Sequence, residues 1–188
     1  MGISTHIKTL TADDSASLAF VDGASDVVLD STYYEYMFVF TDIGPAGDGS
    51  IFSFQVNATD DAGGGYDTSL ITSTFFNAQH SEADDSATLA YHAASDLAQS
   101  ASFQPLTRNI GNGSDESAAG ILHLFSPSST TFVKHFYARF HNMYHADYSM
   151  DNFCAGYIND TTAIDEIQFK MDSGNFDGVI QLYGIAQL

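Results

Sequence analysis

The chain has 188 residues, of which 24 are acidic and only 5 are basic, giving a formal net charge of −19. The basic residues do not cluster, so we expect no phosphate-binding face for nucleic acid and no attachment to an anionic membrane. Cys154 is the only cysteine, which excludes an intrachain disulfide, and we expect a packed thiol.

The acidic residues comprise 20 Asp and 4 Glu. Because Asp favours turns and Glu favours helices, this ratio predicts many turns and few helices. The charge suits either a saline habitat, where salt shortens the Debye length to roughly 4 Å, or an ordinary acidic surface. Residues 1–6 do not resemble a secretion signal, and no apolar run reaches the roughly 20 residues that cross a bilayer, so we expect synthesis in a cytoplasm.

Residues 1–30 are small and polar, and the sequence predicts an extended N-terminal arm or short strands at 17–20 and 27–29. Tyr33–Thr41 is the first clear strand, with apolar residues on both faces. Ile51–Val56 alternates, which predicts that its Phe and Val residues point inward and that its Ser and Gln residues point outward.

Residues 78–105 are the least regular part of the chain. Leu70–Phe76 is expected to form a strand before them, while Ser81–Leu97 is polar and rich in Ala. This composition fits a short helix or a long irregular crossover, and the sequence does not decide between them.

The remaining strands are predicted from short aromatic and β-branched runs, and in the second of them Phe132, Phe136, Ala138 and Phe140 are expected to share one face. These runs are 118–125, 131–141, 153–158, 163–171 and 179–185. About eight strands with one long crossover indicate an all-β, antiparallel β-sandwich, jelly-roll-like, in a single domain over residues 1–188.

Seven histidines raise the question of a metal site. His135 and His141 share strand parity, so a zinc pair across a sheet face is conceivable. The sequence contains no spacing typical of zinc ligands, and we interpret the histidines as solvent-facing or hydrogen-bonded. No metal ligand is therefore predicted among them.

Asp60, Asp61 and Asp67 surround three glycines and superficially resemble a calcium loop. The ligand register of an EF-hand is missing, so the simpler interpretation is an acidic hairpin tip, with calcium between loops or subunits as the alternative.

The sequence predicts no catalytic residue and no cofactor-binding residue. It contains no G-x-S-x-G elbow, and Cys154 lies within a predicted strand, away from any helix N-terminus. Glu35, between two tyrosines, is interpreted as an ordinary edge residue facing solvent. We expect the protein not to be an enzyme.

Tyr137, Tyr144, Tyr148 and Tyr157 lie close in the sequence around a predicted loop at 142–151. Tyrosines beside Asp and Asn suit carbohydrate recognition and protein–protein contacts equally well. A glycan is therefore a possible partner, recognised by this loop and by the loop at 59–67.

The second half of the chain contains an "LF-PSSTT-VKHF" stretch followed by "AGY-N", "SGN-D" and "YGI". This pattern resembles a family of small virion structural proteins of marine tailed bacteriophages. The matching segments are 96–103, 122–136, 155–159, 163–170, 173–178 and 183–185. Phe176 stands where the family usually has Ile, and Met171 and Asp172 stand where small polar residues are usual.

The resemblance implies a virion structural protein made in the host cytoplasm. We expect a capsid decoration protein, a homo-oligomer and most simply a trimer, that contacts other virion proteins such as the major capsid protein. The alternative is a tail- or fibre-associated module that binds a host glycan.

Overall fold

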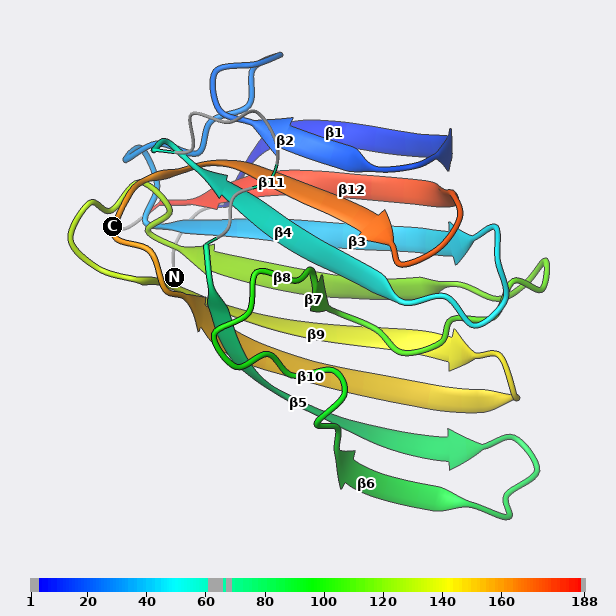
Figure 1. Cartoon of the computed structure of the whole chain (residues 1–188). Coiled ribbons are helices and arrows are strands. Elements are labelled where there is room, and N and C mark those ends of the chain that lie inside the picture. The colour runs from blue at the N-terminus through cyan, green and yellow to red at the C-terminus, as the bar shows by residue number, and fades with distance from the viewer. Residues whose placement is uncertain (1–3, 61–65, 67–68, 187–188) are drawn as a thin grey trace.

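The computed structural model describes residues 4–60, 66 and 69–186, which form two antiparallel sheets packed face to face (Figure 1). The all-β sandwich predicted from the sequence is confirmed, and the described residues contain no helix. It follows that none of these residues forms a helix able to cross a membrane.

The large sheet has eight strands. In spatial order these are β1 (Ser4–Ser15), β12 (Phe176–Ile185), β3 (Glu35–Pro45), β8 (Ala118–Phe125), β9 (Lys134–Tyr144), β10 (Tyr148–Ile158), β5 (Ile71–Ser81) and β6 (Ala87–Tyr91). The small sheet has four strands. These are β2 (Leu18–Val21), β11 (Ile164–Met171), β4 (Phe52–Ala58) and β7 (Gln104–Pro105).

Residues 4–30 do not form a detached arm. β1 pairs with β12 in the large sheet, and β2 pairs with β11 in the small one. The segment at 27–29 is not a strand, although Val27 and Leu29 are buried. The N-terminal region therefore supplies a strand to each sheet despite its polar composition.

The core between the sheets is built from phenylalanines. Phe169 of the small sheet lies at its centre, with ring centroids 5.0 Å from Phe40 and 5.4 Å from Phe38 of the large sheet. Both contacts are tilted or edge-on, the geometry that aromatic pairs prefer. This packing holds the inner face of β3 tightly against β11.

The small sheet covers only part of the large one, and the crossover between β6 and β8 runs over the inner side of the rest (Figure 1). Gln104 joins the two layers, because its Oε1 accepts from Ser73 Oγ at 2.6 Å and its Nε2 donates to the Ser95 carbonyl at 3.0 Å. The short helix considered for residues 81–97 is absent, and this stretch contains β6.

The crossover also explains an error in the expected facing of β4. Ser53 and Gln55 were expected to point to solvent, but both are buried. Gln55 Nε2 donates to the carbonyls of Ala101 and Ser102 at 2.9 Å and 3.2 Å. These bonds compensate for burying an amide.

The strand predicted at 131–141 also needs correction at its start. Phe136, Ala138 and Phe140 share the buried face as expected, whereas Phe132 lies before β9 and is 71% exposed. Lys134, two residues before Phe136, occupies the first inward-facing position of β9 and is fully buried.

Candidate functional site

Part of the outer face of the large sheet differs in charge from the rest of the molecule. Five neighbouring strands, β8, β9, β10, β5 and β6, contain a single carboxylate, Asp151. The whole chain has 24 acidic residues, so acids are strongly depleted here. We call the outward-facing side of these five strands the acid-poor face.

The acid-poor face exposes several large apolar side chains. Phe76 is 40% exposed, Tyr137 46%, Tyr91 55% and Leu89 72%. Strand register places Phe76 between Phe153 and Tyr91 in one row across the sheet. An apolar surface of this breadth is typical of a contact site.

Within this face lies a hollow of about 260 Å³, which we call the aromatic slot. Tyr137 forms one wall, and the stacked rings of Phe76 and Phe153, 4.8 Å apart, form another. Ala155 and Thr74 lie beside Tyr137 in the register and form the floor. The slot exists because these two side chains are small where their neighbours are aromatic.

An ion pair at the edge of the slot fixes one of its walls. Arg139 donates from Nε and Nη2 to the two carboxylate oxygens of Asp151, at 3.0 Å and 2.7 Å. The guanidinium lies 4.9 Å from the centroid of the Phe153 ring, a cation–π distance. The bidentate pair thus holds a cation over the wall ring.

A histidine hydrogen-bonded to a carboxylate supports Tyr137. His123 stacks on the Tyr137 ring with centroids 4.5 Å apart, and its Nδ1 lies 2.6 Å from Glu35 Oε1. Burial and the nearby Glu35 carboxylate raise the pKa of Tyr137, so its hydroxyl stays protonated and able to donate. Glu35, expected to be an edge residue facing solvent, lies on β3 inside the sheet, is 29% exposed and is the carboxylate partner of His123.

The four tyrosines considered for glycan binding do not form one platform. Tyr137 and Tyr157 lie on β9 and β10 within the sheet. Tyr144 and Tyr148 flank the turn between these strands, with centroids 5.9 Å apart. The predicted loop at 142–151 is mostly strand, because β9 continues to Tyr144 and β10 begins at Tyr148.

Six of the seven histidines are paired with protein groups, and His135 makes an edge contact with the Tyr157 ring. His135 and His141 are six residues apart on one strand, so roughly 20 Å separates them, too far to share an ion. His141 Nε2 lies 2.9 Å from Ser149 Oγ, and His80 Nε2 lies 3.2 Å from Asp84 Oδ1. The described part of the chain holds no group of three or more His, Cys, Asp or Glu residues that could bind a metal.

The acidic loop gives no calcium geometry within the described residues. Asp60 Oδ2 accepts from Thr162 Oγ1 at 3.0 Å. Asp61 and Asp67 lie outside the described residues.

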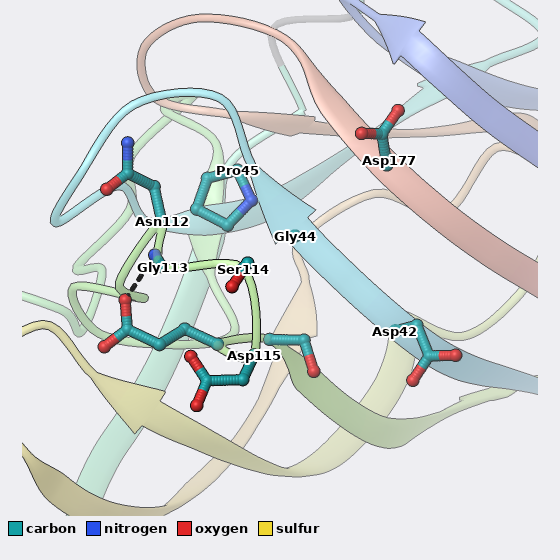
Figure 2. Close-up of a pocket in the computed structure, with 10 residues that line it drawn as sticks. Asp42, Gly44, Pro45, Asn112, Gly113, Ser114, Asp115 and Asp177 are labelled. Atoms are coloured by element: carbon teal, nitrogen blue, oxygen red, sulfur yellow. Dashed lines mark hydrogen bonds between the residues drawn. The ribbon is translucent and has the colours of Figure 1, made fainter.

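A larger hollow, of about 470 Å³, lies at one end of the large sheet between β3 and the loop at 112–117 (Figure 2). Its carboxylates point in different directions, and two of them already have backbone partners. Glu116 accepts from the Gly113 amide, and Asp177 accepts from the Asp14 amide at 2.7 Å. These acids therefore order the loops around the hollow.

Cys154 is buried as predicted, and burial raises the pKa of its thiol. Its side chain belongs to the core. A thiol of this kind is a poor nucleophile because the thiolate is disfavoured.

Comparison with known proteins adds no family assignment. No protein-family model matches the chain, and no curated protein matches it.

The aromatic slot could not be found from the sequence, because it depends on the register of β9, β10 and β5. The absence of acidic residues from 118–145 is visible in the sequence and points to the acid-poor face.

Proposed function

We propose that this chain is a non-enzymatic bacteriophage virion structural protein, made in the host cytoplasm, that acts as a capsid decoration protein. It packs its acid-poor face against another virion protein, the major capsid protein being the expected partner. The sequence resemblance supports the virion assignment, and the acid-poor face supports the packing role.

The composition of this face is the observation that carries the packing role. Cores of protein–protein interfaces are enriched in aromatic residues and Arg and depleted in Asp, Glu and Lys. Here Tyr137, Phe153, Phe76 and Arg139 lie together, and the one carboxylate of the five strands is neutralised by Arg139.

The area of the acid-poor face is also suitable for a protein–protein interface. Strands of these lengths, about 4.8 Å apart, cover roughly 700 Å². Each partner in a standard stable interface contributes about 800 Å². The face is therefore large enough for specific docking without further surface.

No catalytic role is included, because the groups considered for chemistry have structural partners. Glu35 is paired with His123, and Cys154 is buried in the core. The proposed work of the protein is to add binding free energy to the particle, which stabilises the assembled state by mass action.

Cryo-electron microscopy of the intact virion tests the location, and a capsid-binding assay tests the surface. We expect density on the capsid lattice with the acid-poor face inward. Tyr137→Glu and Phe76→Glu should abolish binding to capsids that lack the protein, because each places a charge in the face. Ser114→Glu, at the exposed end of the sandwich, is the matched control and should bind normally.

A second candidate function is glycan binding by a tail- or fibre-associated module, and the aromatic slot favours it. Its aromatic walls can stack on the apolar side of a pyranose, while the Arg139–Asp151 pair offers a donor and acceptors at the edge. A glycan array showing saturable binding that Ala155→Leu removes, together with density confined to the tail, would replace the decoration proposal.

A further inference from the structure

Strand β6 ends the large sheet, and no other described segment lies beyond it (Figure 1). The His92 amide donates to the Phe75 carbonyl, and the Ser81 amide donates to the Ser86 carbonyl. The even-numbered residues of β6 therefore direct their backbone groups toward β5. Because this direction alternates along a strand, Ala87, Leu89 and Tyr91 direct theirs toward the open edge.

The opposite end of the large sheet is protected against strand addition. β1 has register shifts between His6 and Lys8 and between Ala12 and Ser15. It also carries Lys8 and two consecutive aspartates. Bulges and edge charges are the devices that block pairing with another chain.

β6 has none of these devices. It pairs with β5 through five consecutive residues without a shift, and its sequence, Ala-Thr-Leu-Ala-Tyr, contains no charge and no proline. Leu89 at its centre is 72% exposed. An uncharged, regular edge of this kind is ready to accept one more strand.

We propose that β6 pairs antiparallel with β6 of a second copy of this chain, about a two-fold axis through Leu89. In this register Leu89 lies opposite its own counterpart, and Ala87 lies opposite the counterpart of Tyr91. Each of these pairs exchanges two backbone hydrogen bonds, because the odd-numbered residues carry the free groups. The contact is isologous, so it closes as a dimer.

The paired residues of β6 carry no charge, so the strand contact itself adds no acid–acid pair to a molecule of net charge −19. The nearest acids lie outside the strand: Asp85 comes opposite the counterpart of Ala93, and Asp96 bonds the Tyr91 hydroxyl of its own copy. The acid-poor faces of the two copies then become one continuous surface. Overall repulsion remains between the copies, so the dimer should strengthen as salt screens it.

The length of the pairing makes the dimer a weak one. Five residues on each side bury less than the roughly 1,000 Å² expected of a stable interface. The dimer should therefore depend on concentration, and it differs from the trimer expected from the sequence.

Sedimentation velocity of the full chain tests the proposal at low and high salt, about 0.05 M and about 0.5 M NaCl, which differ in Debye length. We expect a monomer–dimer equilibrium that shifts toward dimer with concentration and salt. Leu89→Lys should weaken dimerisation at least tenfold, because two ammonium groups meet at the axis. Leu89→Pro should do the same by removing a free-edge N–H that β5 does not use.

Thr11→Lys is the matched control, since it adds the same charge to an exposed position on the other edge strand and should dimerise like the wild type. Circular dichroism and urea unfolding check that each variant is folded. A wild type that stays monomeric at high salt, a trimer, or a dimer that survives both Leu89 substitutions would overturn the proposal. The isolated protein is measured, so the result is independent of whether the chain decorates a capsid.

Discussion

Lys134 Nζ lies 3.1 Å from the backbone carbonyl oxygen of Asp160, and the side chain that carries this ammonium group is completely buried. It also donates to the Thr162 carbonyl. Burial lowers the pKa of Lys134, while the nearby Asp160 carboxylate opposes the shift. The lysine thus ties the loop before β11 to the beginning of strand β9.

Replacing Lys134 by Met should destabilise the fold, because the two carbonyls lose their donor while the volume is nearly kept. The cost should be about 1–3 kcal/mol, the range for leaving buried polar groups unsatisfied. Urea unfolding measures it, with Lys8→Met on β1 as the control, where we expect little change. A Lys134→Met variant as stable as the wild type would show that the ammonium contributes nothing net.

Protonation of His92 should destabilise the protein at mildly acidic pH. The imidazole bonds to Asn77 Oδ1 and to the Arg108 guanidinium, and burial together with the Arg108 charge lowers its pKa. Its folded pKa therefore lies below the ordinary value of about 6.5. Between these two values the unfolded chain binds more protons, so stability falls as pH drops below about 6.5.

The measurement is the free energy of unfolding of the wild type and of His92→Gln. Each protein is measured at about pH 7.5 and at about pH 5.5, which lie above and below the ordinary histidine pKa. The glutamine variant should lose less stability than the wild type on acidification, because other titrating groups are common to both. Equal losses would show that His92 does not carry the effect.

Gly156→Ala should destabilise the large sheet. A Cβ at this position would lie 2.9 Å from the Phe136 ring and closer still to the Thr72 carbonyl oxygen. Overpacking of this kind costs about 1–3 kcal/mol. Gly44→Ala is the control, since its nearest atom would be 3.9 Å away, and thermal unfolding should separate the two variants.

Cys154 should be protected from thiol reagents in the folded protein, because its side chain is 3% exposed and burial raises its pKa. The extent of labelling by a disulfide reagent should rise with the fraction of unfolded protein as urea is increased. It should not rise when only the reagent concentration is increased. Rapid labelling without denaturant would mean that β10 opens locally.

Much of the fold could be predicted from alternation along single strands. Phe136, Ala138 and Phe140 alternate clearly, and they face the core as expected. Ser53 and Gln55 also alternate with apolar residues, yet they are buried, because the crossover covers their side of β4. A strand's own pattern does not reveal which distant segment covers its polar side.

The candidate site was less accessible from the sequence for the same reason. Ala155 and Thr74 are unremarkable residues until strand pairing places them beside Tyr137. β6 was ambiguous because its alanines suit a helix as well as an edge strand, and its pairing with Phe76 and its neighbours on β5 decides the matter. The pairing of distant strands, which local propensity does not encode, determines both the position of the aromatic slot and the strand structure of β6.

The acidic residues are distributed unevenly, with few of them on one side of the sheet, and this gives the molecule a permanent electric dipole. Near a polyanionic wall, whether a cell envelope or another acidic particle, the resulting torque would turn the side with few acids toward that wall before any atoms touch. Encounters would then begin in the docking orientation, and raising the ionic strength would slow this alignment by shortening the reach of the field.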